Sequence, residues 1–241
     1  MGKIVAIDCF VESVGNYDET WTIVAVDVIR ATTTAVTAVA LGRRCFPVPA
    51  VESVECVASG LTDPLLAGEL GGNMPYGFHI NNSPADVVAR DDIHRPMILL
   101  STSGTRLLCS AGESRVAFAA CLRNVRAQAE YLAHRHDRVA IIGAGARGEF
   151  RKEDQMCCAG IAELLLQQGY RPVNSRTCEI VERWSGASVS DIASGKSAEY
   201  LVRTGQTKDL EFVLGHIDDL EDVYAYRDGE LVRQSVEVLA G

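Results

Sequence analysis

Short runs of β-branched and apolar residues alternate with helical patterns along this chain, and this alternation limits its fold more than any other feature. It is typical of α/β proteins with a largely buried sheet. Gly42 and Gly169 follow two of the helical patterns and indicate where those helices end. The predicted strands are Lys3–Ile7, Thr22–Val26, Arg44–Val48, Met97–Leu100, Arg115–Ala119, Arg138–Ile142 and a segment near Val173–Cys178, and the predicted helices are Thr33–Leu41, Asn124–His134 and Lys152–Gln168.

No stretch rich in proline, glycine and serine divides the 241 residues into separate domains. We therefore expect residues 1–241 to form a single unit, or two closely packed lobes that meet near residues 115–137. The part after Trp184 is more acidic and helical in pattern. Within it, the segment GHIDDLEDVYAY is predicted to be a charged surface stretch.

The chain is acidic, with 32 aspartate and glutamate residues, 23 lysine and arginine residues and a formal net charge of −9. Nucleic acids and anionic membranes need a basic face, so neither is an expected partner. No apolar run approaches the ~18 residues of a membrane span, and the opening MGKIVAIDCF leaves no room for a signal peptide. The eight cysteines form no CxxC pair, which favours reduced thiols and a cytoplasmic location.

The segment VAVDVIRATTTAVTAVALGRR, residues 24–44, places an acid, a base and three hydroxyls where a predicted strand meets a predicted helix. Ligands of open α/β sheets bind beyond the carboxyl ends of strands, and a helix N-terminus attracts anions. Arg30 can hold a phosphate or a carboxylate with two hydrogen bonds, and the threonines can cap the helix or donate hydroxyls. Asp27 would repel the same anion unless a cation lies between them, which suggests Mg²⁺. An ordinary turn with a threonine cap is the alternative for this segment taken alone.

Two further strand ends carry side chains of the same kind. The segment MILLSTSGTRLL brings hydroxyls, a glycine and an arginine, residues 101–106, in front of a helix. The segment VAIIGAGARGEFRKEDQ adds a glycine-rich loop, Arg147, and the acids Glu153 and Asp154. Between them, Glu69 lies among glycines that let a ligand approach the backbone, and the turn NNSP begins a helix. Ordinary turn chemistry explains each loop alone, but several loops of one chemical character indicate a shared anion site.

Three short patterns point to other chemistries, and each lacks the structural setting that its chemistry needs. Cys109 to Arg115 spell CxxGxxR, but a cysteine phosphatase needs a strand before the cysteine and a helix near the arginine, the reverse of the predicted order. Residues 143–148 spell GxGxxG, but acids crowd the following helix start and no strand ending in an acid follows about 20 residues later. His134 and His136 would point to different faces of a helix.

Seven segments, in this order along the chain, resemble the 2-phosphosulfolactate phosphatase family. They are VDVIRATTT, GELGG, NNSP, STSGTR, AACLRN, GEFRKEDQMCCAG and SGKSAEYLVRTGQTKDLEF, and they span nearly the whole chain. Each motif alone is weak, whereas the ordered set is specific. The resemblance implies a Mg²⁺-dependent α/β phosphatase that converts 2-phospho-3-sulfolactate to sulfolactate, a step towards coenzyme M. We accordingly expect a three-layer α/β/α fold with a mixed sheet.

The resemblance also implies roles for residues of these segments. Asp27, Arg30 and Glu69 are expected to be catalytic. Asp27 and Glu69 are also expected to bind the metal, together with Glu153 or Asp154. The expected partner is a small anionic phosphorylated substrate, and a homodimer is the default assembly from base rates. The expected substrate-binding residues are Thr32, Thr33, Asn82, Ser83, Ser103, Gly104, Thr105, Arg106, Asn124 and Arg147.

Two questions stay open from the sequence. We prefer a mechanism in which the metal neutralises phosphoryl oxygens and positions an attacking water, but Asp27 could instead be the nucleophile of a phosphoenzyme. Ile29 removes the DxD signature of aspartyl nucleophiles, which favours water attack. The substrate could also be a different phosphorylated 2-hydroxy acid. A non-catalytic anion-binding module is the remaining alternative, although such a module would not need Asp27, Glu69 and Asp154.

Overall fold

A single mixed sheet runs through the computed structural model, which describes residues 2–113 and 115–235. Its strands are β1 (Ile4–Cys9), β2 (Thr22–Val26), β3 (Cys45–Val48), β4 (Leu65–Gly68), β5 (Met97–Leu100), β6 (Ala117–Ala120), β7 (Arg138–Gly143), β8 (Arg171–Pro172), β9 (Asp222–Arg227) and β10 (Glu230–Ser235). They follow the order β4-β5-β3-β10-β9-β6-β2-β7-β1-β8. β9 pairs antiparallel with β6 and with β10, and β10 pairs antiparallel with β3. All other neighbouring strands pair parallel.

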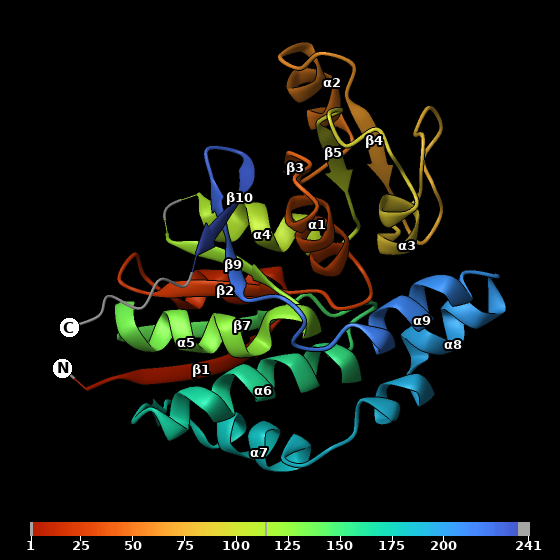
Figure 1. Ribbon diagram of the computed structural model, residues 1–241. Helices are drawn as coiled ribbons and strands as arrows, with labels where there is room; N and C mark the ends of the chain where they lie inside the picture. The colour runs from red at the N-terminus through yellow and green to blue at the C-terminus, as the bar shows by residue number, and fades with distance from the viewer. Residues whose placement is uncertain (1, 114, 236–241) are drawn as a thin grey trace.

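Helices cover both faces of this sheet and complete a three-layer α/β/α fold (Figure 1). They are α1 (Ala31–Ala40), α2 (Glu52–Ser59), α3 (Pro84–Val88), α4 (Gly104–Gly112), α5 (Val125–Arg135), α6 (Lys152–Gln167), α7 (Ser175–Trp184), α8 (Lys196–Arg203) and α9 (Thr207–Gly215), with 3-10 turns η1 (Val11–Asn16), η2 (Leu122–Asn124) and η3 (Val189–Ser194). Side chains alternate along β2. Val24 and Val26 pack with α5, α6 and α7, whereas Ile23 and Ala25 pack with α1 and α4.

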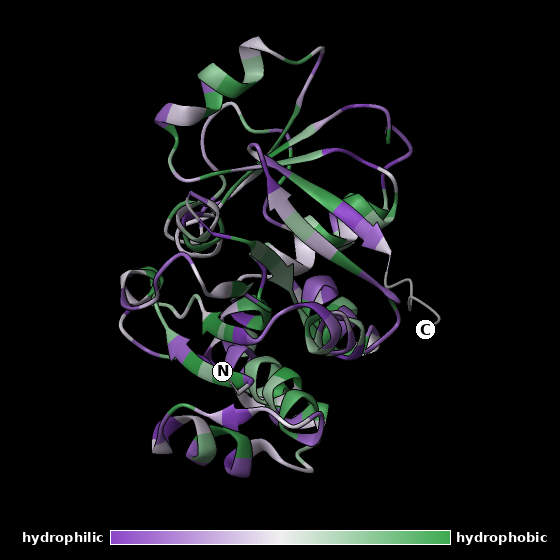
Figure 2. Cartoon of the chain, turned by 90° about the vertical axis from the view of Figure 1, so that its left-hand side faces the viewer, coloured by the Kyte–Doolittle hydropathy of each residue, from purple (hydrophilic) through white to green (hydrophobic). Residues whose placement is uncertain are grey.

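The helices differ in how much of their surface they bury. Most carry hydrophobic and hydrophilic residues in turn along their length, as expected of helices that bury one face (Figure 2). In α1, by contrast, nine of ten residues are buried. It packs against β3, β6 and β10 and also against α3 and α4, which its small alanine and threonine side chains allow. None of the described helices has the length and apolar composition that a membrane crossing requires.

Six predicted strands and three predicted helices are confirmed, with ends that differ by at most two residues. They are β1, β2, β3, β5, β6 and β7, and α1, α5 and α6. The strand predicted near Val173–Cys178 is wrong, because only Arg171–Pro172 is extended there. Asn174 accepts a hydrogen bond from the Thr177 amide and thereby caps α7, which occupies the rest of that segment.

The segment GHIDDLEDVYAY is not a surface stretch throughout, because its second half is β9. Val223 and Tyr224 are fully buried, and β9 lies between β6 and β10 inside the sheet. The acidic residues at 218–222 gave the segment its charged character, and they precede the apolar residues that form the strand. β4 and β10 were likewise not predicted. The expectation of one unit or two lobes for residues 1–241 stays a prediction.

Candidate active site

The carboxyl ends of β2, β4, β5 and β7 converge on a cavity of about 500 Å³. Asp27 follows β2 and Glu69 follows β4, whereas Ser103 follows β5 and Gly145 follows β7. Three antiparallel pairings separate β3 from β6, so the group β3–β5 runs opposite to the group containing β2 and β7. Figure 1 shows the first group standing across the second. Residues of α8 also line the cavity, which therefore lies where the two parallel groups and the C-terminal helices meet.

Asp27 is buried at the end of β2, where its backbone is held by the neighbouring helix. Thr32 Oγ1 accepts a hydrogen bond from the Asp27 amide at 2.9 Å and donates one to the Asp27 carbonyl oxygen at 2.8 Å. The carboxylate itself lies against Gly104, where a Cβ atom would overlap it. Gly104 therefore provides the space for the Asp27 carboxylate.

Asp154 joins two of the loops that surround the cavity. Its Oδ1 accepts a hydrogen bond from the Val28 amide at 2.9 Å, and its Oδ2 accepts one from the Gly145 amide at 3.2 Å. The residue lies in the first turn of α6 and is 3% exposed, yet it lines the cavity. The loop after β2 and the glycine-rich loop after β7 are thus fixed to one carboxylate.

Burial and mutual repulsion disfavour the charged forms of these two acids. Burial and, next, the negative charge of Glu69 raise the pKa of Asp27 from 3.8 to about 7. Burial and the charge of Asp27 raise the pKa of Asp154 well above its ordinary value. Two carboxyl groups in this setting bind a proton or a cation readily, because either relieves their repulsion.

This donor set fits a Mg²⁺ ion that is bound by few protein ligands. Mg²⁺ commonly takes one or two carboxylates and completes its octahedron with water and substrate oxygens. Asp27 and Asp154 provide two such carboxylates. Within residues 2–113 and 115–235, no group of three or more metal-binding side chains occurs. The four acids predicted as ligands therefore do not gather into one cluster.

The other two predicted metal ligands have different surroundings. Glu69 Oε1 accepts a hydrogen bond from the Thr102 amide, and Oε2 accepts from the Gly72 amide, each at 2.7 Å. Its carboxylate thus joins the loops after β4 and β5 while lining the cavity. Glu153 is 1% exposed and does not line the cavity, and its Oε2 has no hydrogen-bond partner among the described residues.

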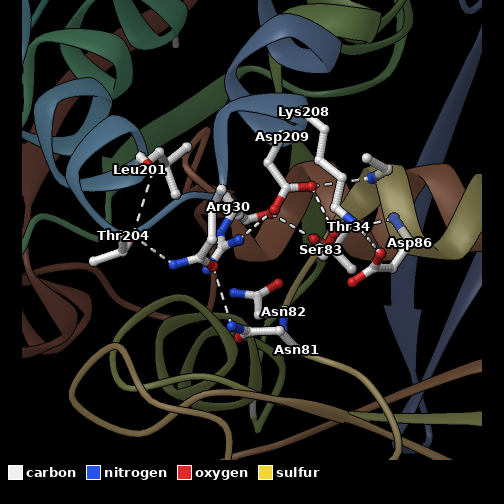
Figure 3. Close-up of polar contacts among 12 residues, drawn as sticks. Arg30, Thr34, Asn81, Asn82, Ser83, Asp86, Leu201, Thr204, Lys208 and Asp209 are labelled. Carbon is white, nitrogen blue, oxygen red and sulfur yellow. Dashed lines mark hydrogen bonds and ion pairs between the residues drawn. The ribbon is translucent and has the colours of Figure 1, made fainter.

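Arg30 lines the cavity beside Asp27 and is held by a residue that sequence reasoning missed. Its Nη1 donates to the Asp209 carboxylate of α9, and both side chains are buried (Figure 3). The Ile29–Arg30 peptide bond is cis. Asp209 belongs to a helical segment with several charged residues, and no sequence motif marks it as buried. Only its contacts with residues distant in sequence, Arg30 and Ser83, distinguish it from a surface acid.

Basic side chains from the loop after β7 and from α8 also line the cavity. Glu149 accepts hydrogen bonds from Arg151 at 2.8 Å and from Lys196 at 2.5 Å, so these two cations are paired. Arg147 has no ion pair within the described part of the chain. Arg203 also lines the cavity, and its guanidinium lies over the Tyr200 ring. Arg147 and Arg203 are therefore placed to meet an anion.

The structure divides the predicted site residues into two groups. Asp27, Arg30, Glu69, Asn82, Ser103, Arg147 and Asp154 line the cavity. Thr32, Thr33, Ser83, Gly104, Thr105, Arg106, Asn124 and Glu153 do not.

Most members of the second group bond to the backbone or to other side chains near the cavity. Thr33 Oγ1 donates to the Val28 carbonyl oxygen at 2.7 Å, and Thr105 bonds to Ser101. Asn124 accepts from the Cys121 amide at 3.0 Å, and Arg106 is exposed. The threonines thus fix the loops, and their hydroxyls are already occupied.

The CxxGxxR and GxGxxG patterns do not serve the chemistry that their spelling suggests. Cys109 lies within α4 with its thiol near the Pro47 carbonyl oxygen, and burial raises its pKa to about 11. A protonated thiol inside a helix cannot act as the nucleophile of a phosphate-binding loop. In the GxGxxG loop, the Gly145 amide donates to a carboxylate, so it is not free to hold a pyrophosphate.

Comparisons with known proteins identify the family of the chain. The family model described as 2-phosphosulpholactate phosphatase matches residues 10–229. A probable 2-phosphosulfolactate phosphatase of Symbiobacterium thermophilum is 31% identical over 217 residues, which cover 87% of this chain and 92% of that protein. The probable 2-phosphosulfolactate phosphatase of Pseudothermotoga lettingae is 39% identical over 138 residues, 57% of this chain and 59% of that protein, so this match spans less than two thirds of its length. The chain belongs to the 2-phosphosulpholactate phosphatase family.

Proposed function

We propose that this protein is a phosphoric monoester hydrolase that converts 2-phospho-3-sulfolactate to sulfolactate and phosphate with Mg²⁺. The buried pair Asp27 and Asp154 carries this proposal, because it lies in a cavity that arginines also line. Carboxylates beside an anion site make chemical sense when a cation joins them to the anion. The names of the family and of these relatives support the choice of substrate.

The residues in and around the cavity have distinct roles in the proposed reaction. Asp27 and Asp154 would hold the Mg²⁺, which supplies neutralisation of phosphoryl oxygens and orientation of a water. Arg30 binds the phosphoryl group, because its planar guanidinium can donate two hydrogen bonds to one anion. Arg147 binds a second anionic group of the substrate. Gly104 keeps the space in which the Asp27 carboxylate lies.

The charges of the substrate match the charges of the cavity. 2-Phospho-3-sulfolactate carries a phosphate, a carboxylate and a sulfonate. Arg30, Arg147 and Arg203 line the cavity together with the paired cations Arg151 and Lys196. A simple phosphate monoester would leave part of this basic lining unused, so we expect a substrate with more than one anionic group.

Phosphate release from 2-phospho-3-sulfolactate, measured with and without Mg²⁺, tests the proposal. 2-Phospholactate serves as the second substrate, because it lacks the sulfonate but keeps the phosphorylated 2-hydroxy acid. We expect release that needs Mg²⁺ and that is faster with the sulfonate. Faster hydrolysis of 2-phospholactate would show that the substrate is not 2-phospho-3-sulfolactate. Full activity after exhaustive chelation would show that the reaction does not need a metal. Binding of both compounds without hydrolysis would indicate an anion-binding module.

A further inference from the structure

Asp209 receives three hydrogen bonds from two segments that are remote in sequence. The residue is 1% exposed and lies in the first turn of α9. Its Oδ2 accepts from Arg30 Nη1, whereas its Oδ1 accepts from Ser83 Oγ at 2.6 Å and from the Ala85 amide at 3.2 Å. Figure 3 shows Arg30 and Ser83 reaching this carboxylate from different sides. One acid of α9 thus joins the start of α1 to the start of α3.

Both of these segments contribute a side chain to the cavity. Arg30 lines it, and so does Asn82, which directly precedes Ser83. Ser83 caps α3, because its hydroxyl also accepts a hydrogen bond from the Asp86 amide at 3.0 Å. Asn82 is 2% exposed, and its Oδ1 has no hydrogen-bond partner among the described residues. The contacts of Asp209 therefore fix two neighbours of the cavity.

We propose that Asp209 is a positioning residue that holds the Arg30 guanidinium and the Asn82 segment at the places where they meet the anionic group of a phosphorylated substrate. The proposal rests on the proposed function for the identity of that substrate. Asp209 does not line the cavity, so it acts through Arg30 and the start of α3. A carboxylate suits this task because it fixes the planar guanidinium through a charge-assisted hydrogen bond.

A second ion pair between the same helices provides a matched control. Lys208 of α9 pairs with Asp86 of α3, directly beside the Asp209 contacts (Figure 3). Both of its side chains are more exposed than those of Arg30 and Asp209, and neither residue lines the cavity. Asp86→Asn therefore weakens the same helix contact without touching a cavity residue.

The first experiment compares the KM and kcat of Asp209→Asn and Asp86→Asn. We expect Asp209→Asn to raise KM by about tenfold or more, because Arg30 loses a charged partner that orients it. Asp86→Asn should leave KM within about twofold of the wild-type value, as a surface ion pair contributes little. Equal KM values for all three proteins, with Asp209→Asn folded, would overturn the proposal.

The second experiment covers the case in which Asp209→Asn does not fold. It uses Arg30→Ala and the double variant Arg30→Ala/Asp209→Asn, and removal of both partners leaves no buried charge unpaired. Low concentrations of guanidinium ion are added, and binding of inorganic phosphate with Mg²⁺ is measured by calorimetry. We expect guanidinium to restore phosphate binding in Arg30→Ala but not in the double variant. Equal restoration in both would show that Asp209 does not position the guanidinium.

Wild-type phosphate release separates the two proposals. If the wild-type protein releases no phosphate, the proposed function fails, and the calorimetric comparison still tests the role of Asp209. If the wild-type protein is active and guanidinium restores both variants equally, only the role of Asp209 fails.

Discussion

Two buried carboxylate sites lie close to the same cavity, and they differ in how their charge is balanced. Asp209 faces a guanidinium, a hydroxyl and a backbone amide, so its charge is compensated within the protein. Burial and the negative charges of Glu69 and Glu153 raise the pKa of Asp27 to about 7, and the Ala31 amide and Arg30 offset only part of this effect. A buried carboxylate without a cation lowers the stability of the fold, which is why such groups are concentrated at sites where a bound ligand neutralises them.

This difference predicts opposite consequences for stability and activity. Loss of Asp209, the acid whose charge is balanced, should lower stability first, because the buried guanidinium of Arg30 is left without a partner. Loss of Asp27, the acid whose charge is not balanced, should relieve repulsion and lower turnover first. The two sites thus test whether charge balance distinguishes an acid that positions other residues from an acid that acts on the substrate in this chain.

Asp27→Asn should give the largest change, a loss of turnover on the order of a thousandfold or more. The amide keeps the shape of the carboxylate but cannot hold a metal or act as a nucleophile. The same variant should melt at a higher temperature than the wild-type protein above pH 7, because the repulsive charge is gone. Turnover assays and thermal melting measure the two effects, with Asp86→Asn as the control. Near-normal turnover in the folded variant would show that Asp27 is an ordinary turn residue.

Asp209→Ala should lower the free energy of unfolding by about 3–5 kcal/mol, the usual effect of breaking a buried ion pair. Arg30 would keep its charge without the carboxylate, and Ser83 and the Ala85 amide would lose an acceptor. Denaturant unfolding measures this change, and Arg30→Ala/Asp209→Ala should recover part of it. A loss no larger than that of Asp86→Ala would contradict the distinction between the two sites.

The stability of the wild-type protein should fall as pH rises when no divalent cation is present. The pKa of Asp27 is 3.8 ordinarily and about 7 in the folded protein, so the folded state binds more protons between these values. The free energy of unfolding therefore decreases across this window, and the penalty is complete above about pH 7. Added Mg²⁺ should reduce the decrease by replacing the proton. Asp27→Asn should show a smaller pH dependence, and an unchanged slope in that variant would assign the effect to another group.

The sequence was sufficient for the strand-end part of the cavity, because its signals are local. Asp27, Arg30 and Arg147 each lie within four residues of the end of a strand, and the carboxyl end of a strand is where ligands bind in such folds. All three residues line the same cavity in the structure, and their roles there stay a prediction. Thr32 and Thr33 were predicted on the same local grounds, but they bond to the backbone and do not line the cavity.

The contribution of the C-terminal helices could not be found in the same way. Asp209, Tyr200 and Arg203 lie on helices whose charged surface is typical of solvent-exposed segments. Tyr200 Oη donates to the Gly72 carbonyl oxygen at 2.8 Å, a contact between residues 128 positions apart. Long-range contacts of this kind leave no period or spacing in the sequence. β9 was missed for a related reason, because its place inside the sheet depends on pairing with β6 and β10.

Cys109→Ser should give the smallest change, because Cys109 lies outside both carboxylate sites. The thiol lies inside α4, and burial raises its pKa to about 11, so it is protonated at neutral pH. Its sulfur lies 3.4 Å from the Pro47 carbonyl oxygen and 3.4 Å from Tyr226 Oη, and a serine hydroxyl can replace both contacts. We expect turnover within about twofold of the wild-type value and a stability change of about 1 kcal/mol. A folded Cys109→Ser variant without phosphate release would make Cys109 the nucleophile, and the unbalanced pair Asp27 and Asp154 would then need another explanation.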